Sequence, residues 1–235
     1  GSMAKDANQR ALSLVYKLSS GNKLSLNGQI DRIDMTEDGR YFMVMDYKTG
    51  NAAINIMDVY YGIKLQLLTY LLVTKQFLSA QQGEEALPVG MLYYFLKQPR
   101  ASLASHGESQ QEVIAALEKK LLMPGWIVAD KELVQLIDST LSQPGAKSRF
   151  IHATMKKGGD LMSNATYLRQ PRELELLLEY VEELLQHTGR DILAGRIAPV
   201  PYRNREGHST CEYCNYRAIC GFDAQLEGFG YRRVV

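Results

Sequence analysis

An apolar run from Tyr41 to Met45 leads directly into Asp46-Tyr47-Lys48, and this segment constrains the fold of the chain more than any other. Before it, from Leu24 to Ile33, apolar residues roughly alternate with polar ones, and Thr36-Glu37-Asp38-Gly39 supplies turn residues between the two segments. Alternation, a turn and an apolar run predict two antiparallel strands joined by a tight turn. Because the second strand is apolar enough to be buried, the charged groups at its end require partners or a metal ion.

Two acidic residues of this strand pair are candidate metal ligands. Side chains two residues apart in a strand point to the same face, so Asp46 and Lys48 are expected to project together, with their roots about 6.5 to 7 Å apart. Asp31 on the paired strand can lie opposite them. With the backbone carbonyl of Tyr47, the two carboxylates would form an oxygen-rich site of the kind that Mg²⁺ or Mn²⁺ prefers.

Such a site suits hydrolysis of a phosphodiester bond. The reaction builds negative charge on the phosphoryl oxygens, which a divalent cation stabilises while it also lowers the pKa of a bound water. Lys48 could orient that water or neutralise the developing charge. Asp-Tyr-Lys alone is a weak motif, and an exposed Asp and Lys on the polar face of a hairpin are the alternative. Arg32 and Asp34, next to Asp31, are expected to form a supporting ion pair rather than to act in catalysis.

The rest of the chain predicts mostly helices and one more strand. Residues 4 to 17 have apolar positions at near-helical spacing, typical of the tail of a helix. A long helix is predicted from Asp58 to Leu78, ended by Gln81-Gln82-Gly83, and the apolar stretch from Val89 to Leu96 predicts a third, fully buried strand. Three further helices are expected at Glu112 to Leu122, Asp130 to Leu141 and Glu173 to Leu193.

Gln66 and Tyr70 lie one turn apart on one face of the long predicted helix. Both could simply pack in the core. A glutamine in a stripe of leucines and tyrosines nevertheless requires hydrogen-bond partners if it is buried, so its position is also a candidate part of the site.

Three cysteines occur close together as Cys211, Cys214 and Cys220, and the sequence has no others. An odd, clustered set favours a metal site over disulfides. Three thiolates provide three corners of a tetrahedral zinc site or of an iron-sulfur cluster, and either site needs a fourth ligand. His208, three residues before Cys211, could complete a local zinc site. With either metal the cluster is expected to be structural, and three unligated thiols are the weaker alternative.

Composition limits the classes of function. Lys and Arg total 27 against 26 Asp and Glu, so a nucleic-acid footprint must be a local patch. The sequence has neither an apolar stretch long enough for a membrane span nor a basic-then-apolar export signal, which favours a cytoplasmic protein. Gly1-Ser2-Met3 is typical of residues left after removal of an expression tag. The candidate DNA-contacting cations lie mostly in loops: Lys97, Arg100, Lys147, Arg149, Lys156, Lys157, Arg203, Arg205, Arg232 and Arg233.

Three motifs follow one another in a characteristic order and spacing. They are Gly28-x-Ile30-Asp31-Arg32-Ile33-Asp34, Asp46-Tyr47-Lys48-Thr49-Gly50 and Tyr60-Tyr61-Gly62-x₃-Gln66-Leu67-x₂-Tyr70-Leu71. With the cysteine segment from Cys211 to Asp223, they resemble the RecB-like branch of the PD-(D/E)xK nucleases, and within it the nuclease domains of AddAB-type bacterial helicase-nucleases. The resemblance runs from about Leu24 to the C-terminus and therefore covers most of the chain.

The resemblance implies an α/β fold of the restriction-endonuclease kind, with a mixed central sheet flanked by helices. It implies that Asp31 and Asp46 bind the catalytic Mg²⁺ or Mn²⁺ and that Lys48 assists the attacking water. It further implies that Gln66 and Tyr70 help to position the active site and the DNA strand.

Two ligands that the resemblance implies are not found in the sequence. An earlier helix in this family usually supplies a His or Glu near the metal, but no His precedes His106 and Asp6 is the only acid before Asp31. That helix is expected to lie upstream of this sequence. The resemblance also implies that the three cysteines ligate a [4Fe-4S] cluster whose fourth cysteine lies far upstream, so the cluster is expected to be incomplete or absent in this chain.

For function, the resemblance implies a Mg²⁺-dependent deoxyribonuclease of the exonuclease type. It would cut the 5′-ended single strand of DNA unwound by a helicase, during recombinational repair of double-strand breaks, together with a second, helicase-nuclease A subunit. A non-catalytic DNA-binding scaffold and a stand-alone RecB-like exonuclease are the alternatives. Residues 4–205 are expected to form the nuclease core, and residues 206–235 a cysteine-cluster segment packed on it.

Overall fold

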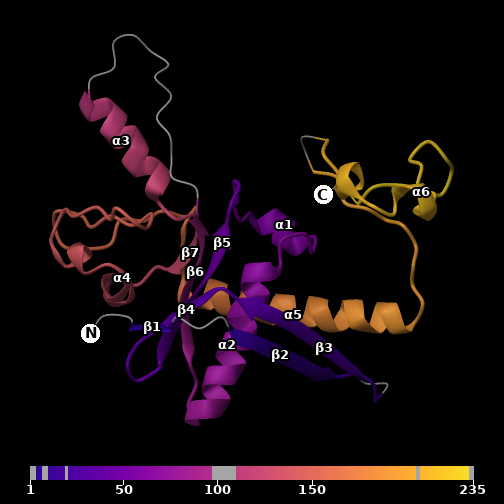
Figure 1. Cartoon of the computed structure of the whole chain (residues 1–235), viewed down its shortest axis with the longest axis horizontal. Helices are drawn as coiled ribbons and strands as arrows, with labels where there is room; N and C mark the ends of the chain where they lie inside the picture. The colour runs from indigo at the N-terminus through magenta and orange to yellow at the C-terminus, as the bar shows by residue number, and fades with distance from the viewer. Residues whose placement is uncertain (1–3, 7–9, 19–20, 97–109, 205–206, 233–235) are drawn as a thin grey trace. The chain divides into compact units, whose positions relative to one another are not determined.

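The computed structural model of the chain describes residues 4–6, 10–18, 21–96, 110–204 and 207–232 (Figure 1). Contacts divide the chain into two compact units. We call residues 1–186 the core unit and residues 187–235 the C-terminal unit. The core unit contains the three nuclease-like motifs, and the C-terminal unit contains the three cysteines.

A mixed six-stranded sheet forms the centre of the core unit. In sheet order, the first two pairs of neighbouring strands are antiparallel. The next three pairs are parallel, antiparallel and parallel. The predicted mixed α/β fold, with a central sheet flanked by helices, is confirmed. In sheet order the strands are β1 (Ala4–Asp6), β4 (Arg32–Met35), β5 (Tyr41–Lys48), β6 (Leu87–Phe95), β7 (Gly125–Val128) and β8 (Leu168–Arg169).

Strand β5 is buried on both faces, as its apolar sequence predicts. Phe42 and Val44 point into one hydrophobic core, which is covered by helix α2 (Gln66–Gln82) and helix α5 (Pro171–Leu193). Met43 and Met45 point into a second core on the other face, which is covered by the short helix α4 (Lys131–Ile137) and the loops after it. The strand period of two therefore divides one continuous apolar run between two cores.

The N-terminal segment corrects one prediction. The spacing in residues 4–17 predicts the tail of a helix, but the described part of this segment forms β1 and β2 (Arg10–Lys17), and β2 pairs antiparallel with β3 (Lys23–Ile30). Leu14, Tyr16 and Leu18 are buried, while Val15 and Lys17 between them are exposed. The alternation has a period of two, which suits a strand, and pairing with β3 overrides the near-helical spacing of the other apolar residues.

The expected strand from Leu24 to Ile33 is split at a bend at Asp31. Its first part, β3, pairs with β2, and its second part, β4, pairs antiparallel with β5 across a tight turn. The turn contains Gly39 at a φ of 68°, a conformation that favours glycine. The predicted antiparallel hairpin is confirmed for β4 and β5 only, because the chain changes partner at the bend.

The helix expected from Asp58 to Leu78 is also split. Asn55 rather than Asp58 caps a short helix α1 (Ile56–Tyr60), since its side chain accepts a hydrogen bond from the amide of Met57. Gly62, at a φ of 76°, separates α1 from α2. The predicted stop after Gln82 is confirmed, because Gly83 ends α2 at a φ of 75°.

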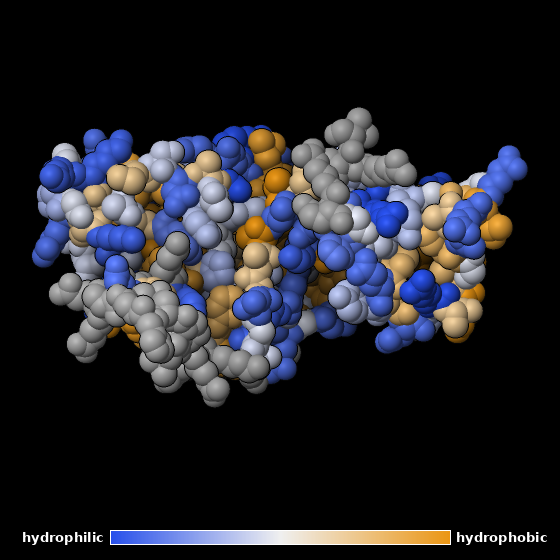
Figure 2. Space-filling view, turned by 90° about the horizontal axis from the view of Figure 1, so that it is seen from above, coloured by the Kyte–Doolittle hydropathy of each residue, from blue (hydrophilic) through white to orange (hydrophobic). Residues whose placement is uncertain are grey.

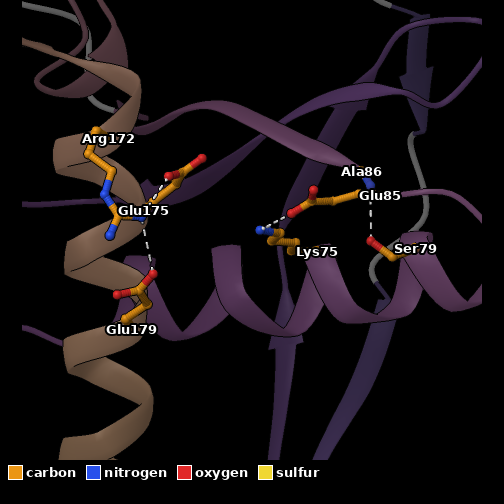
Figure 3. Close-up of polar contacts among 7 residues, drawn as sticks. All are labelled: Lys75, Ser79, Glu85, Ala86, Arg172, Glu175 and Glu179. Atoms are coloured by element: carbon orange, nitrogen blue, oxygen red, sulfur yellow. Dashed lines mark hydrogen bonds and ion pairs between the residues drawn. The ribbon is translucent and has the colours of Figure 1, made fainter.

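Polar contacts fasten the ends of these elements (Figure 3). Lys75 Nζ lies 2.7 Å from a carboxylate oxygen of Glu85, and the amide of Ala86 donates to Ser79 Oγ at 2.9 Å, which joins α2 to the start of β6. Along α5, Arg172 forms exposed ion pairs with Glu175 and Glu179. Exposed pairs of this kind contribute little to stability.

The other predicted helices are confirmed in part. Helix α3 (Gln110–Leu121) and helix α5 match their expected positions closely. The segment from Asp130 to Leu141 is not one helix. Asp130 caps α4, which ends at Ile137, and a 3₁₀ turn η1 (Ser139–Ser142) follows with Asp138 as its own cap.

The C-terminal unit contains little regular structure beyond the end of α5. Its described part has one 3₁₀ turn, η2 (Thr210–Tyr213), and one short helix, α6 (Arg217–Cys220). The ring of Phe222 packs edge-on against Phe229 and Tyr231, and Arg203 lies 4.9 Å above the centre of the Tyr231 ring. The expected packing of residues 206–235 on the nuclease core stays a prediction.

Within the described parts of the chain, no helix combines the length and the apolar character needed to cross a membrane. Exposed apolar side chains are scattered among hydrophilic ones on the face shown in Figure 2. Scattered exposure of this kind is ordinary for a protein surface in contact with water.

Gly125 provides a test of the sheet. A Cβ added there would lie 2.1 Å from the carbonyl oxygen of Met91 and 2.8 Å from the Cα of Leu92. We expect Gly125→Ala to lower the free energy of unfolding in urea by at least about 3 kcal/mol, because backbone atoms must move to accept the methyl group. Gly83→Ala is the matched control. It meets no atom within 4 Å, so it should cost only the about 1–2 kcal/mol of its left-handed backbone conformation. Equal losses in the two variants would contradict the close approach of β7 to β6.

Candidate active site

The C-terminal end of β5 brings Asp46 and Lys48 to the face of the sheet that α2 covers. Asp46 continues the row formed by Phe42 and Val44, and only 3% of its surface is exposed. Lys48 is half-buried beside it. The prediction that these two side chains project together from one face is confirmed by their contact, since Lys48 Nζ lies 2.6 Å from Asp46 Oδ2.

Helix α2 supplies the other partners of Lys48. The ammonium donates to Gln66 Oε1 at 2.9 Å, and the amide nitrogen of Gln66 donates to the hydroxyl oxygen of Tyr70 at 3.0 Å. Gln66 is the first residue of α2 and Tyr70 lies one turn further, so the two reach the site from the same helical face. The structure therefore brings four of the predicted site residues into one chain of contacts from Asp46 to Tyr70.

Asp31 reaches the same strand end from the bend between β3 and β4. Its Oδ2 accepts a hydrogen bond from the backbone amide of Tyr47 at 2.8 Å. Strand β4 begins at Arg32, opposite Met45, so it does not continue alongside the last three residues of β5. The carboxylate of Asp31 occupies the place that a continuing strand would take. Because the amide and carbonyl of one extended residue point to the same edge, the Tyr47 carbonyl faces the Asp31 side as well.

These groups fit a divalent cation. Asp46 Oδ2 is buried and has no hydrogen bond within the described part of the chain, since the nearby ammonium of Lys48 lies outside hydrogen-bonding angles. The ammonium of Lys48 balances the charge of this carboxylate, while the absence of a hydrogen bond leaves its oxygen able to accept a further ligand. With Asp31 and the Tyr47 carbonyl, Asp46 provides a hard-oxygen set of the kind that Mg²⁺ and Mn²⁺ prefer. The described residues contain no group of three or more acidic, His or Cys side chains that could hold a metal ion.

Arg32 and Asp34 form the predicted supporting ion pair. The guanidinium donates two hydrogen bonds to the carboxylate, at 2.7 and 2.6 Å, and Asp34 is 5% exposed. These hydrogen bonds are the main reason that the pKa of Arg32 is raised, although partial burial works in the opposite direction. A two-point contact of this kind fixes the direction of both side chains. The pair therefore stiffens β4 immediately after the bend at Asp31.

Tyr93 is a site residue that the sequence motifs do not single out. It lies beside Asp46 in the parallel pairing of β5 with β6, and Lys48 Nζ lies 5.7 Å from the centre of its ring. Burial raises the pKa of the Tyr93 phenol, and the negative charge of Asp46 raises it further. The adjacent tyrosines Tyr93 and Tyr94 are visible in the sequence. Only the register of β6 against β5 shows which of them faces the site.

Gly28 explains how Tyr70 can lie close to β3. A Cβ at Gly28 would come within 3.2 Å of the Tyr70 ring, which is tighter than ordinary packing. The glycine of the first motif therefore allows the hydroxyl of Tyr70 to remain where it contacts Gln66.

The cysteines lie in the C-terminal unit as free thiols. Cys214 and Cys220 are exposed, and Cys211 lies in η2, whose capping box joins Ser209 to Glu212. Among the described residues, no three Cys, His, Asp or Glu side chains lie together as a metal site.

His208, the candidate fourth zinc ligand, is placed beside an acid. Its Nδ1 lies 3.3 Å from Glu212 Oε2. The pKa of Glu212 is lowered first by its hydrogen bond with the Ser209 amide and then by His208. The metal predictions for the cysteines stay predictions.

The predicted DNA-contacting cations divide into three groups. Four lie in the exposed loops of residues 147–157, where Arg149 forms an ion pair with Glu118. Two hold the C-terminal unit together, since Arg203 donates to the Gly207 carbonyl and Arg232 to the Val200 carbonyl. The remaining four lie outside the described residues: Lys97, Arg100, Arg205 and Arg233. A DNA track along these residues stays a prediction.

Comparison with known proteins agrees with this geometry. The sequence profile of the PD-(D/E)XK nuclease superfamily matches residues 4–221. The B subunit of the ATP-dependent helicase/deoxyribonuclease of Acetivibrio thermocellus is 34% identical over 217 residues, which is 91% of this chain and 18% of that protein. The proteins of the same name from Bacillus subtilis and Ruminiclostridium cellulolyticum are 34% and 33% identical, and cover 93% of this chain in each case. The chain spans 18% and 19% of the length of these two relatives. The resemblance stated from the motifs is confirmed.

Tyr93 gives a test of the electrostatics of the site. Its phenol has a raised pKa in the folded chain, so the unfolded chain loses that proton first as the pH rises above about 10. The contribution of this phenol to the free energy of unfolding is therefore complete below pH about 10. It declines as the pH rises toward the pKa of the phenol in the folded chain. We expect Tyr93→Phe to reduce this alkaline decline, measured as the free energy of unfolding against pH.

Asp46→Asn should lower the pKa of Tyr93, followed by tyrosinate absorbance, without returning it to the ordinary value, because burial remains. Tyr94→Phe, which removes an exposed phenol from the same strand, is the matched control for loss of a hydroxyl. An alkaline decline that is the same in Tyr93→Phe as in the unaltered chain would contradict the assignment.

Proposed function

Because this chain belongs to the PD-(D/E)XK nuclease superfamily, we propose that it is the metal-dependent nuclease domain of a helicase-nuclease and hydrolyses phosphodiester bonds in unwound, single-stranded DNA. One observation carries the proposal. The buried Asp46 Oδ2, without a hydrogen bond among the described residues, lies at the strand end where Asp31, Lys48 and Gln66 converge. This proposal is supported by a buried carboxylate that pairs with an ammonium yet keeps an oxygen able to accept a ligand, at the strand end that a second acid also reaches.

Asp31 and Asp46, with the carbonyl of Tyr47, would hold Mg²⁺ or Mn²⁺. When bound, the ion would lower the pKa of a water molecule and neutralise charge on the phosphoryl oxygens. The hydrogen bond from the Tyr47 amide to Asp31 fixes that carboxylate in place before any substrate arrives. The contact between Lys48 and Asp46 keeps an ammonium directly beside the candidate ligands.

Lys48 is the residue that we assign to the attacking water. Its ammonium has three donors. One hydrogen bond goes to Gln66, and the contact with Asp46 is an ion pair outside hydrogen-bonding angles, so donors remain to orient water or a phosphoryl oxygen. Gln66 holds the ammonium through its carbonyl oxygen, and Tyr70 receives the other end of the same amide. Gln66 and Tyr70 therefore act through Lys48, by limiting the directions that its flexible side chain can take.

The proposal for the assembly in which this chain works rests on its relatives. Each is named as the B subunit of an ATP-dependent helicase/deoxyribonuclease, and we propose that this chain works in the same kind of assembly. Its partners would be an A subunit with helicase-nuclease activity and DNA, and its role would be exonucleolytic processing of double-strand breaks for recombinational repair. Cutting of the 5′-ended strand can be tested with forked DNA labelled at one end or the other.

We also propose that Cys211, Cys214 and Cys220 ligate a [4Fe-4S] cluster in the full-length protein, with a fourth ligand from outside the segment that carries them. Their spacing and exposure support this, because exposed thiols can be reached by ligands from elsewhere. Zinc held by the cysteines and His208 is the second candidate, and it would require His208 to leave Glu212.

Substitutions in the carboxylate site test the nuclease assignment. We expect Asp46→Asn to lower the rate of Mg²⁺-dependent cleavage of a single-stranded oligonucleotide by at least about a thousandfold, and to weaken Mn²⁺ binding measured by calorimetry. Lys48→Met should lower cleavage similarly while Mn²⁺ binding persists, because the lysine is not a ligand. Circular dichroism should show both variants folded.

Asp38→Asn is the matched control, since Asp38 is an exposed acid in the turn of the same hairpin. It should leave both cleavage and metal binding unchanged. Unchanged cleavage in Asp46→Asn would refute the assignment. Absence of Mn²⁺ binding in the unaltered chain, with DNA binding retained, would favour a DNA-binding scaffold.

The cysteine proposal is tested on the full-length protein by metal analysis and visible absorption. We expect iron and acid-labile sulfide with a visible absorption band, and loss of both in Cys214→Ser. Zinc in place of iron, released by His208→Ala, would support the second candidate. A protein with neither metal would leave three structural thiols and overturn both.

A further inference from the structure

Two exposed tyrosines lie directly behind the candidate site, on the opposite face of the sheet. Residues alternate along a strand, so Tyr47 points away from the face that carries Asp46 and Lys48. The parallel register pairs Tyr47 with Tyr94 of β6, and the centres of the two rings are 5.6 Å apart at an interplanar angle of 60°. We call Tyr47 and Tyr94 the tyrosine pair.

The tyrosine pair is exposed, although Met45 and Leu92 on the same face of β5 and β6 are buried. Deeper in the sheet the same face is fully covered, with Met45 5% and Leu92 1% exposed. Tyr47 and Tyr94 are 39% and 44% exposed. The second core therefore ends two residues before the pair on each strand. Two large aromatic rings are left accessible beside the most buried acid of the site.

The surroundings of the pair favour stacking over phosphate binding. Arg32 of β4 is a cation on this face, opposite Met45, and it is held by two hydrogen bonds to Asp34. Tyr47 adds a smaller contribution to the raised pKa of Arg32, so the two side chains lie close to each other. Because Asp34 neutralises Arg32, the described contacts of the tyrosine pair favour aromatic stacking over phosphate binding.

The edge of β5 connects the two faces. Strand β4 stops at Arg32, so beyond Met45 the edge is covered by the Asp31 carboxylate rather than by a neighbouring strand. A DNA strand lying along this edge could present a phosphate to Asp46 and Lys48 and the adjoining base to the tyrosine pair. The backbone carbonyl of Tyr47 belongs to the proposed metal site, and its ring belongs to the tyrosine pair. The proposed phosphate contact and the proposed base contact are therefore adjacent, because one residue contributes to both.

We propose that Tyr47 and Tyr94 form a stacking platform for an unpaired nucleobase next to the phosphate that is cut. The proposal rests on the proposed nuclease function and adds the feature that selects the substrate. In a duplex each base is paired and stacked on its neighbours, whereas an unpaired base can turn outward and place its face on an aromatic ring. The platform therefore selects single strands, and it tolerates any base because every base has a π-face.

The test uses Tyr94, whose backbone and side chain take no part in the metal site. Single-turnover cleavage is measured on a set of single-stranded oligonucleotides, each lacking one base at a different position. For the unaltered chain we expect one position at which the missing base lowers kcat/KM by about tenfold, the effect of losing one stacked base. Tyr94→Leu should lower kcat/KM on the intact strand by about the same factor. The missing base should then have no further effect, while Tyr94→Phe should behave like the unaltered chain.

A matched control separates stacking from general damage. Phe77 is an exposed aromatic residue on α2, about three turns from Gln66, and Phe77→Leu should leave the position-dependent loss intact. If the missing base lowers kcat/KM equally in Tyr94→Leu and in the unaltered chain, the platform is overturned. The same conclusion follows if Phe77→Leu abolishes the base effect as Tyr94→Leu does.

A binding measurement keeps this inference distinct from the nuclease assignment. A 2-aminopurine at the sensitive position, or scanned along the strand if no cleavage occurs, reports stacking by fluorescence quenching with Ca²⁺ in place of Mg²⁺. Quenching in the unaltered chain that is lost in Tyr94→Leu supports the platform even if cleavage fails and the nuclease assignment falls. Equal quenching in both proteins, with cleavage intact, overturns the platform alone.

Discussion

The rest of the core unit is arranged around a carboxylate buried at the end of an apolar strand. Strand β5 is covered on both faces, so Asp46 enters a region where water cannot solvate its charge. The energy of an unbalanced charge in such a place is large, and the surrounding elements all reduce it. Lys48 comes from the same strand, Gln66 from α2 holds Lys48, and Tyr93 from β6 places its ring beneath the ammonium. The strands and the helix here bring the counter-charge of Lys48, and the groups that contact it, to the carboxylate of Asp46.

The bend at Asp31 performs a second task for the same site. By changing partner from β2 to β5, the chain ends one strand pairing and starts another at the residue whose carboxylate we propose as a metal ligand. No neighbouring strand covers the end of β5 at the proposed site, yet the Tyr47 amide does not lose its hydrogen bond because Asp31 accepts it. Local irregularity in a sheet is common next to active sites for this reason.

Much of this arrangement could be predicted from the sequence. The period of two placed Asp46 and Lys48 on one face, and the period of 3.6 placed Gln66 and Tyr70 one turn apart. Periodicity alone does not identify the strand or helix against which each segment packs. Apolar residues at 11, 12, 15 and 18 fit a helix, while Leu14 and Tyr16 fit a strand, and only pairing with β3 decides between them. The role of Tyr93 was hidden for the same reason, because it depends on the register between β5 and β6.

The contact between Lys48 and Asp46 has a consequence for the life of the protein. An ammonium already balances the buried carboxylate, so the charge of Asp46 does not oblige the chain to find a cation before it can fold. Folding of the domain and binding of the proposed divalent ion are therefore separate events. If the proposed divalent ion is the activator, its supply would decide when the domain acts rather than whether it folds.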